Sequence, residues 1–319
     1  MKVKILTHGD TDGICSGALA LARYPEAEVW FTHPAGLLKD LKDVGEDLVI
    51  TCDVAISEKD KEDIFKEFSK IKKSGEIIYI DHHPLPLRTI SSDLPCTRIV
   101  RDVTKSASEL IFRHFQKYVM PLNRVALYGA ISDYCDETEF VREELYLYDK
   151  RTIYLEAGLL SQSLGEAKGD YKFKRELVKE LSSGTAPSSI NRVVRNAIRS
   201  AKKEWILYEY VRENVRTVGE IAIVDEVGEG VSAGKAAKFA IGVTGKKVGI
   251  GIKLRNGFVD MSVRKRGDFP MDLDNALRNI APRLRGSGGG HPSAAGARIL
   301  LNKVDEFTDV LAREISALI

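Results

Sequence analysis

The sequence predicts an α/β protein, with a mostly parallel, doubly wound sheet domain followed by a smaller α/β domain. Three observations predict this class. Short β-branched runs alternate with helical patterns in the first half, a length of 319 residues is typical of two domains, and the composition changes near residue 161. Hydrophobic residues make up 44% and charged residues 29% of the chain, which excludes disordered, collagen-like and disulfide-scaffold proteins.

The first half alternates strand and helix signals. Strands are expected at Val3–Thr7, Glu28–Thr32, Asp47–Thr51, Ile77–Ile80 and Thr97–Val100. Helices are expected at Ile14–Arg23, Glu58–Lys73, Ser106–Tyr118 and Asn123–Ser132. Such strands, joined by helices, form a parallel sheet that is covered on both faces. Parallel sheets bind ligands beyond the carboxyl ends of their strands, so the residues that follow each strand are the first candidates for a site.

The second half begins after a break in this pattern. Glycine, proline and serine residues interrupt residues 161–189, around a short charged helix at 172–181, and a long charged helix follows at Asn191–Val215. Later strands are expected at Glu220–Val224, Val248–Leu254, Phe258–Val263 and Ala297–Leu301, helices at Leu273–Ile280 and Val304–Leu318, and a glycine-rich loop at Gly286–Gly290. We therefore expect a first domain at 1–165, a linker and connecting helix at 166–218, and a second domain at 219–319.

The two halves carry opposite net charges. Residues 1–165 contain 21 basic and 27 acidic residues, a net charge of −6. Residues 166–319 contain 27 basic and 19 acidic residues, a net charge of +8. An acidic half is typical of cation binding and a basic half of anion binding, although chance drift between domains produces such differences too. No run of ~20 apolar residues and no apolar signal region is evident, so we expect a cytoplasmic protein without a membrane partner.

Acidic and histidine side chains follow the expected strands and one helix of the first half. They are His8, Asp10, Asp12, Asp53, Asp81, His82, His83 and Asp133. Taken singly, each aspartate is more often a turn residue or a helix cap, as Asp12 would be for the helix near Ile14. Together they meet at one edge of the sheet, where uncompensated carboxylates would repel one another. Carboxylate and imidazole groups are ligands of Mn²⁺, Mg²⁺ or Zn²⁺. The number of such groups here predicts two ions that share a bridging carboxylate.

The second half contains a glycine-rich segment with a histidine, Gly288-Gly289-Gly290-His291. Consecutive glycines let backbone N–H groups approach an anion and the histidine adds a donor, although a plain flexible turn has the same composition. Arg264 follows an expected strand, where an isolated arginine is normally solvated. The pattern G-x-x-x-x-G-K-[ST] is absent from the sequence, which excludes a Walker-type nucleotidase.

These motifs resemble those of the DHH superfamily of phosphoesterases, in the branch with the DHH-associated C-terminal domain. Asp81-His82-His83 matches the motif that names the family, and the other N-terminal motifs follow in the family's order. The glycine-rich segment, followed by Ala294-Ala295-Gly296, matches the signature of the C-terminal domain. Many bacterial members place three residues between the histidine and the first aspartate of the first motif, whereas one residue separates His8 from Asp10.

The resemblance implies two divalent metal ions, with Mn²⁺ as the first choice and Mg²⁺ as the alternative. The implied ligands are His8, Asp10, Asp12, Asp53, His82 and Asp133. His8 and Asp10 would bind the first ion, Asp53 would bridge both, and the remaining three would bind the second.

The resemblance also implies the residues that act on the substrate. His83, Asp81 and Arg264 would be catalytic, with Asp81 fixing a neighbouring imidazole and His83 facing the scissile phosphate. The substrate-binding residues would be His83, Arg264, Gly288, Gly289, Gly290 and His291. Those of the C-terminal domain would bind a substrate phosphate across a cleft between the two domains.

The function implied is that of a metal-dependent phosphodiesterase, which hydrolyses short oligonucleotides or dinucleotides to mononucleotides with a hydroxide activated by two metal ions. No aromatic stacking platform is evident in the sequence, which favours short substrates of single-stranded RNA or DNA. One alternative is a RecJ-like exonuclease on longer strands, which the basic helix at Arg192–Lys203 would support unless it is simply solvated. A nucleotide bisphosphate phosphatase and a non-catalytic DHH-like replication scaffold are further alternatives, and a homodimer is compatible with the sequence.

Overall fold

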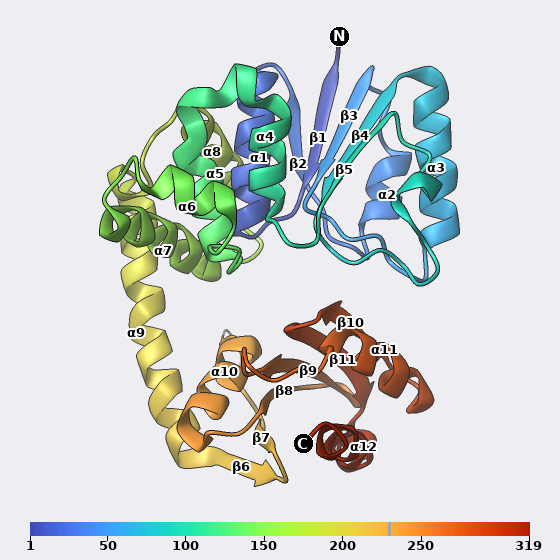
Figure 1. Cartoon of the computed structure of the whole chain (residues 1–319), viewed down its shortest axis with the longest axis vertical. Helices are drawn as coiled ribbons and strands as arrows, with labels where there is room; N and C mark the ends of the chain where they lie inside the picture. Colours follow the sequence, from blue (N-terminus) through green and yellow to red (C-terminus); the bar gives the residue numbers. More distant parts are fainter. Residues whose placement is uncertain (229–230) are drawn as a thin grey trace. The chain divides into compact units, whose positions relative to one another are not determined.

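The computed structural model describes residues 1–228 and 231–319, which form two compact units (Figure 1). The N-terminal unit is Met1–Ser200 and the C-terminal unit is Ala201–Ile319, so that helix α9 (Asn191–Asn214) contains the boundary. The expected boundary lay after residue 165, in the segment expected to be a linker. The N-terminal unit continues beyond it because helix α8 (Tyr171–Ser182) buries Phe173, Leu177 and Leu181 in the core of that unit.

A parallel five-stranded sheet with the strand order β2-β1-β3-β4-β5 forms the centre of the N-terminal unit. Its strands are β1 (Val3–Thr7), β2 (Glu28–Phe31), β3 (Leu48–Cys52), β4 (Glu76–Asp81) and β5 (Arg98–Arg101). These bounds confirm the expected strands closely. Because all neighbouring strands are parallel, their carboxyl ends meet at one edge of the sheet.

Helices cover both faces of this sheet, as expected (Figure 1). One face carries α1 (Thr11–Arg23), α4 (Ala107–Val119), α5 (Asn123–Ser132), α7 (Lys150–Glu166) and α8, and the other α2 (Leu37–Lys42) and α3 (Lys61–Ser74). Successive side chains of a strand point to opposite faces, so Ile5 packs into the first helical layer and Leu6 into the second. A short helix, α6 (Glu139–Leu145), follows α5. The sequence pattern did not predict α2, α6 or α7.

The C-terminal unit has a mixed six-stranded sheet with the order β10-β11-β9-β8-β7-β6. Its strands are β6 (Val215–Val218), β7 (Ile221–Val224), β8 (Val248–Arg255), β9 (Phe258–Lys265), β10 (Ser287–His291) and β11 (Ala294–Leu300). Helices α11 (Leu273–Arg283) and α12 (Val304–Ser316) share one apolar cluster with the sheet, and α10 (Ala233–Thr244) and the end of α9 share another. This second α/β layer confirms the expected fold class.

The prediction of a glycine-rich loop at Gly286–Gly290 is wrong. Most of this segment is strand β10, which pairs with β11 in an antiparallel ladder. Helix α11 lies close above it, and a Cβ on Gly288 would lie 2.8 Å from the carbonyl oxygen of Leu277. Gly289 and Gly290 have φ angles of 155° and 153°, which side-chain-bearing residues rarely adopt. Helix packing and backbone conformation therefore both require glycine here.

Short 3₁₀ helices lie at Ser91–Asp93, Met120–Leu122, Pro187–Ser189 and Leu301–Lys303. None of the helices in the described ranges combines the length and the apolar character that crossing a membrane requires.

Candidate metal centre

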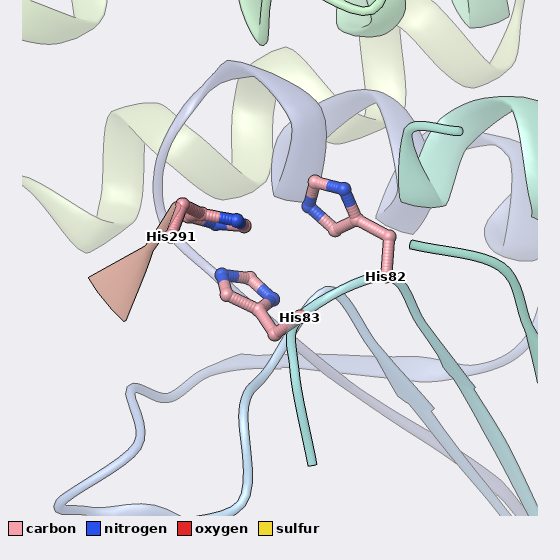
Figure 2. A group of neighbouring side chains, drawn as sticks. All are labelled: His82, His83 and His291. Atoms are coloured by element: carbon pink, nitrogen blue, oxygen red, sulfur yellow. The ribbon is translucent and has the colours of Figure 1, made fainter. Parts of the chain in front are cut away.

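Acidic and histidine side chains gather at the carboxyl edge of the parallel sheet in the N-terminal unit. Each of them lies at the end of a strand or helix. His8 follows β1, Asp10 and Asp12 lie at the start of α1, Asp53 follows β3, Asp81 ends β4 and is followed by His82 and His83, and Asp133 lies at the end of α5. His82 and His83 are consecutive residues, and their rings lie 4.8 Å apart (Figure 2). All of the residues that the sequence singled out in this unit therefore come together.

Three groups of potential metal ligands share one carboxylate, that of Asp53. The groups are His8, Asp10 and Asp53; Asp12, Asp53 and His82; and Asp53, Asp81 and His83. Within each group, one oxygen or nitrogen atom of every residue lies within 4.8 Å of the others. The Nε2 atom of His82 is 3.4 Å from Asp53 Oδ1 and 3.4 Å from Asp133 Oδ2. Asp53 is thus placed where a carboxylate could bridge two ions.

Asp53 has surroundings that fit a divalent cation. It is 2% exposed, and the Oδ2 atom has no hydrogen-bond partner among the residues that the structure describes. Burial raises the pKa of Asp53 well above its usual value, and the charges of Asp10 and Asp12 raise it further. A cation supplies both the missing partner and the opposite charge, so this carboxylate and its neighbours fit a metal ion.

His8 and Asp10 form an ion pair beside Asp53. His8 Nδ1 lies 2.8 Å from Asp10 Oδ2 and 3.9 Å from Asp53 Oδ2, so the short spacing of the first motif still brings His8 to the centre. The other oxygen of Asp10 accepts a hydrogen bond from the Gly13 N–H at 3.0 Å and caps α1. Burial opposes ionisation of Asp10, but the charge of His8 and these hydrogen bonds hold its pKa below the usual value.

Asp12 links the centre to a neighbouring helix. Its carboxylate accepts the backbone N–H groups of Ala107 at 2.7 Å and Ser108 at 3.0 Å, in the first turn of α4. It does not act as the N-cap of its own helix, the alternative that its position allowed, because Asp10 takes that place. Asp12 Oδ2 also lies 4.0 Å from His82 Nε2. Since each carboxylate oxygen has two lone pairs, both oxygens keep capacity for a further partner.

Gly129 of α5 leaves room for the Asp12 carboxylate. A Cβ at this position would lie 2.6 Å from Asp12 Oδ1 and 2.2 Å from Ser108 Oγ. We expect Gly129→Ala to lower the melting temperature, although alanine normally stabilises a helix interior by about 0.5–1 kcal/mol relative to glycine. Gly158→Ala is the matched control, because Gly158 lies within α7 and its Cβ would meet nothing within 4 Å. Thermal denaturation of the two variants checks that the melting temperature changes in opposite directions. A higher melting temperature for both variants would contradict this packing.

Asp81 orients His83. Its Oδ1 atom lies 2.8 Å from His83 Nδ1, and its Oδ2 atom accepts hydrogen bonds from the Tyr79 hydroxyl at 3.0 Å and the His83 N–H at 3.2 Å. Burial opposes protonation of His83, but the Asp81 charge and hydrogen bond raise its pKa to about 9. Burial raises the pKa of Asp81, whereas the positive charge of His83 lowers it. The resulting pKa of Asp81 is about 2. The contact with Asp81 therefore favours the protonated form of His83.

Two residues at the centre carried no signal in the sequence. Cys135 forms a further group of potential ligands with His82 and Asp133, but burial and the Asp133 charge raise the pKa of its thiol to about 12. Lys174 of α8 lies against the backbone beside His8, since a Cβ on Gly9 would be 2.6 Å from its Nζ atom. The segment with Lys174 was expected to be part of a linker, so no pattern connected it to the site.

The remaining predicted site residues belong to the C-terminal unit. The Arg264 guanidinium, at the end of β9, lies against the first turn of α10, 2.5 Å from where a Cβ on Gly234 would stand. His291 ends β10. The Gly290 N–H donates to Asp274 Oδ1 at 2.6 Å, so this amide is engaged within the unit.

Comparison with known families identifies both parts of the chain. Residues 2–134 match the DHH family, N-terminal domain, and residues 206–317 match the DHHA1 domain. A comparison with curated proteins gave no match.

Solved structures of similar fold cover 99% of this chain at low sequence identity. RecJ from Thermus thermophilus in complex with Mn²⁺ has a TM-score of 0.69 and 15% identity, and this chain spans 52% of its length. A pGpG-specific phosphodiesterase, PggH from Vibrio cholerae, has a TM-score of 0.59 and 15% identity, with 100% of its chain covered. The DHH domain of a member of a ribosomal-protein family has a TM-score of 0.73 and 18% identity, with 87% covered. Since the two matched domains lie in order and together span most of the sequence, the chain belongs to the DHH family and carries a DHHA1 domain.

Proposed function

We propose that the chain is a metal-dependent phosphodiesterase that hydrolyses short oligonucleotides or dinucleotides to mononucleotides. The observation that carries the proposal is the position of Asp53, a buried carboxylate shared by three groups of potential metal ligands. DHH-family members are metal-dependent hydrolases, and RecJ from Thermus thermophilus has been solved with Mn²⁺ and with Mg²⁺. Water would add to phosphorus while the bond to one nucleoside oxygen breaks, leaving a phosphate monoester and a hydroxyl group.

The metal centre in this proposal holds two divalent ions, with Mn²⁺ as the first choice. His8 and Asp10 would hold one ion, the trio of Asp12, His82 and Asp133 the other, and Asp53 both. Bound divalent ions lower the pKa of a water molecule and stabilise negative charge on phosphate oxygens.

Side chains outside the proposed set of metal ligands would bind and orient the substrate. Asp81 holds His83 and favours its protonated form, so His83 can donate a charge-assisted hydrogen bond to a phosphate oxygen. In the C-terminal unit, Arg264 and His291 would bind a phosphate group of the substrate, with the glycine segment beside them. The net positive charge of residues 166–319 supports anion binding there.

Asp81→Asn tests the positioning of His83. The change keeps the shape of the side chain but removes the charge that holds the imidazolium, so the pKa of His83 falls from about 9. We expect kcat/KM to drop about ten- to hundredfold, the usual cost of losing such an orienting partner. The alkaline limb of the pH–rate profile should move to lower pH. NMR titration of His83 measures its pKa directly, and an unchanged value would contradict the assigned role.

A second candidate function, exonuclease action on longer single strands, is favoured by the basic face of α9. Arg195, Arg199 and Lys202 are exposed on this helix, where they could contact a phosphate backbone. Such contacts are salt-dependent, so activity on long strands should fall steeply as ionic strength rises, whereas activity on dinucleotides should change little.

A substrate panel tests the proposed function. End-labelled RNA and DNA, from dinucleotides to long single strands, are incubated with Mn²⁺, Mg²⁺ or EDTA, and a nucleoside 3′,5′-bisphosphate is included as a further substrate. The proposal predicts metal-dependent release of mononucleotides with the fastest turnover on the shortest chains. Faster turnover on long strands would favour the exonuclease, and release of inorganic phosphate from the bisphosphate alone would favour a phosphatase. No metal-dependent hydrolysis of any substrate would contradict a catalytic role.

A further inference from the structure

A cavity of about 460 Å³ lies beside the candidate metal centre, within the N-terminal unit. Its lining includes His8 and Asp10, together with residues from the end of β2, from α7 and from α8. Its volume falls in the range of ligand pockets, roughly 300–1,000 Å³. The cavity is therefore large enough for a nucleotide unit and is continuous with two of the potential metal ligands.

A buried cation forms one wall of this cavity. Lys174 is 8% exposed, and among residues 1–228 and 231–319 no carboxylate oxygen lies within the 4.0 Å ion-pair distance of its ammonium group. Asp10, which lines the same cavity, is the carboxylate whose charge acts on Lys174. Burial of an ammonium group without a paired anion is unfavourable, so an anionic group in the cavity would be stabilised. Lys168, which is exposed, adds a second positive charge.

Two aromatic rings form a second wall. Phe31 and Tyr171 stack with their centroids 6.0 Å apart and an angle of 18° between their planes. Tyr171 is 47% exposed, and the Lys174 ammonium lies 5.7 Å from the centre of its ring. An exposed ring next to a cation is the combination with which proteins bind a base and its phosphate. The sequence had shown no stacking platform, because Phe31 and Tyr171 lie far apart along the chain.

We propose that this cavity binds one nucleotide of the substrate next to the cleaved bond, with its base against Tyr171 and a non-scissile phosphate on Lys174. The inference rests on the proposed function, because His8 and Asp10 connect the cavity to the metal centre. The proposed binding mode predicts that a terminal phosphate on the substrate increases its affinity for the chain. If Lys174 only balanced the charge of Asp10, its loss would change metal binding and leave the preference for a terminal phosphate intact.

The first experiment compares pApA with ApA as substrates in the presence of Mn²⁺. The wild-type chain should have the lower KM for pApA. Lys174→Gln should raise the ratio of the KM for pApA to the KM for ApA about ten- to hundredfold, the usual loss of one charge-assisted hydrogen bond. Lys174→Arg, which keeps the charge, should retain the preference. Lys172→Gln is the matched control, since Lys172 is exposed on the same helix and does not line the cavity.

The aromatic wall is tested by Tyr171→Leu. Loss of one stacking partner should raise the KM for both dinucleotides by about tenfold, because the base is present in each. An unchanged KM for both substrates would overturn the placement of the base.

A binding measurement separates this inference from the proposed function. Calorimetry with AMP and the full-length chain in EDTA needs no catalysis, and AMP should bind the wild type and lose affinity about tenfold or more in Lys174→Gln. Such binding without hydrolysis of any substrate would support the cavity and contradict the proposed function. Hydrolysis with the same pApA preference in wild type and Lys174→Gln would overturn the inference and keep the function. An equal rise in KM for pApA and ApA, with weaker Mn²⁺ binding, would also overturn it.

Discussion

Asp53→Asn is expected to lower kcat/KM for a dinucleotide by about a thousandfold or more, because several kcal/mol of metal-dependent stabilisation would be lost. Asp53 belongs to the groups of potential ligands proposed for each ion, so the change removes a negative ligand from both proposed ions at once. Asparagine keeps the size of the side chain, which separates the loss of charge from a packing defect. Steady-state kinetics with Mn²⁺ measures the effect.

The same variant should fold. In EDTA its melting temperature should not fall below that of the wild type, because a neutral amide replaces a buried carboxylate whose Oδ2 atom has no partner in the described part of the chain. Asp43→Asn is the control, since Asp43 is exposed at the end of α2 and should tolerate the change without loss of activity. Wild-type turnover by a folded Asp53→Asn variant would contradict the bridging role.

The metal-free protein is expected to lose stability as pH rises from about 4 to about 8. Burial raises the pKa of Asp133 from 3.8 to about 8, with a further contribution from the charges of Asp12 and Asp10, and burial also raises the pKa of Asp53. Between the unfolded and folded pKa values, the folded chain binds more protons than the unfolded chain, so the free energy of unfolding falls as pH increases. His83 also lowers the free energy of unfolding as pH rises from 6.5 to about 9, because its pKa in the folded chain is raised.

Mn²⁺ should reverse this loss, since it compensates the carboxylate charges that accumulate in the folded state. The increase in melting temperature caused by Mn²⁺ should therefore be larger at pH 8 than at pH 5, by about 5 °C or more. Thermal denaturation in EDTA and in Mn²⁺ across this pH range checks both statements. An equal effect of Mn²⁺ at both pH values would show that these carboxylates do not bind it.

The parallel sheet and the position of the metal centre could be predicted from the sequence because two simple rules apply. Runs such as Val3–Thr7 and Ile77–Ile80 are β-branched and buried, which is typical of central parallel strands. Parallel strands present their carboxyl ends at one edge, so the acids that follow them had to meet. Residues as far apart as Asp12 and Asp133 could thus be assigned to one site from the sequence alone.

Other features depend on packing that these rules do not describe. The glycines of β10 carry no side-chain pattern that marks a strand, and their partner β11 and the covering helix α11 define their conformation. Helix α8 lies between glycine- and serine-containing segments, which resembled a linker, although Phe173, Leu177 and Leu181 follow a helical spacing that indicates a buried face. The partner of Asp81 is determined by side-chain conformation, which sequence spacing does not encode.

The most direct test of the two-ion centre is a crystal structure of the full chain grown with Mn²⁺, with anomalous diffraction measured at the manganese edge. The account predicts two anomalous peaks at the carboxyl edge of the parallel sheet, with Asp53 bound to both and His8 and His82 on opposite sides. A single peak, or peaks that Asp53 does not contact, would contradict it.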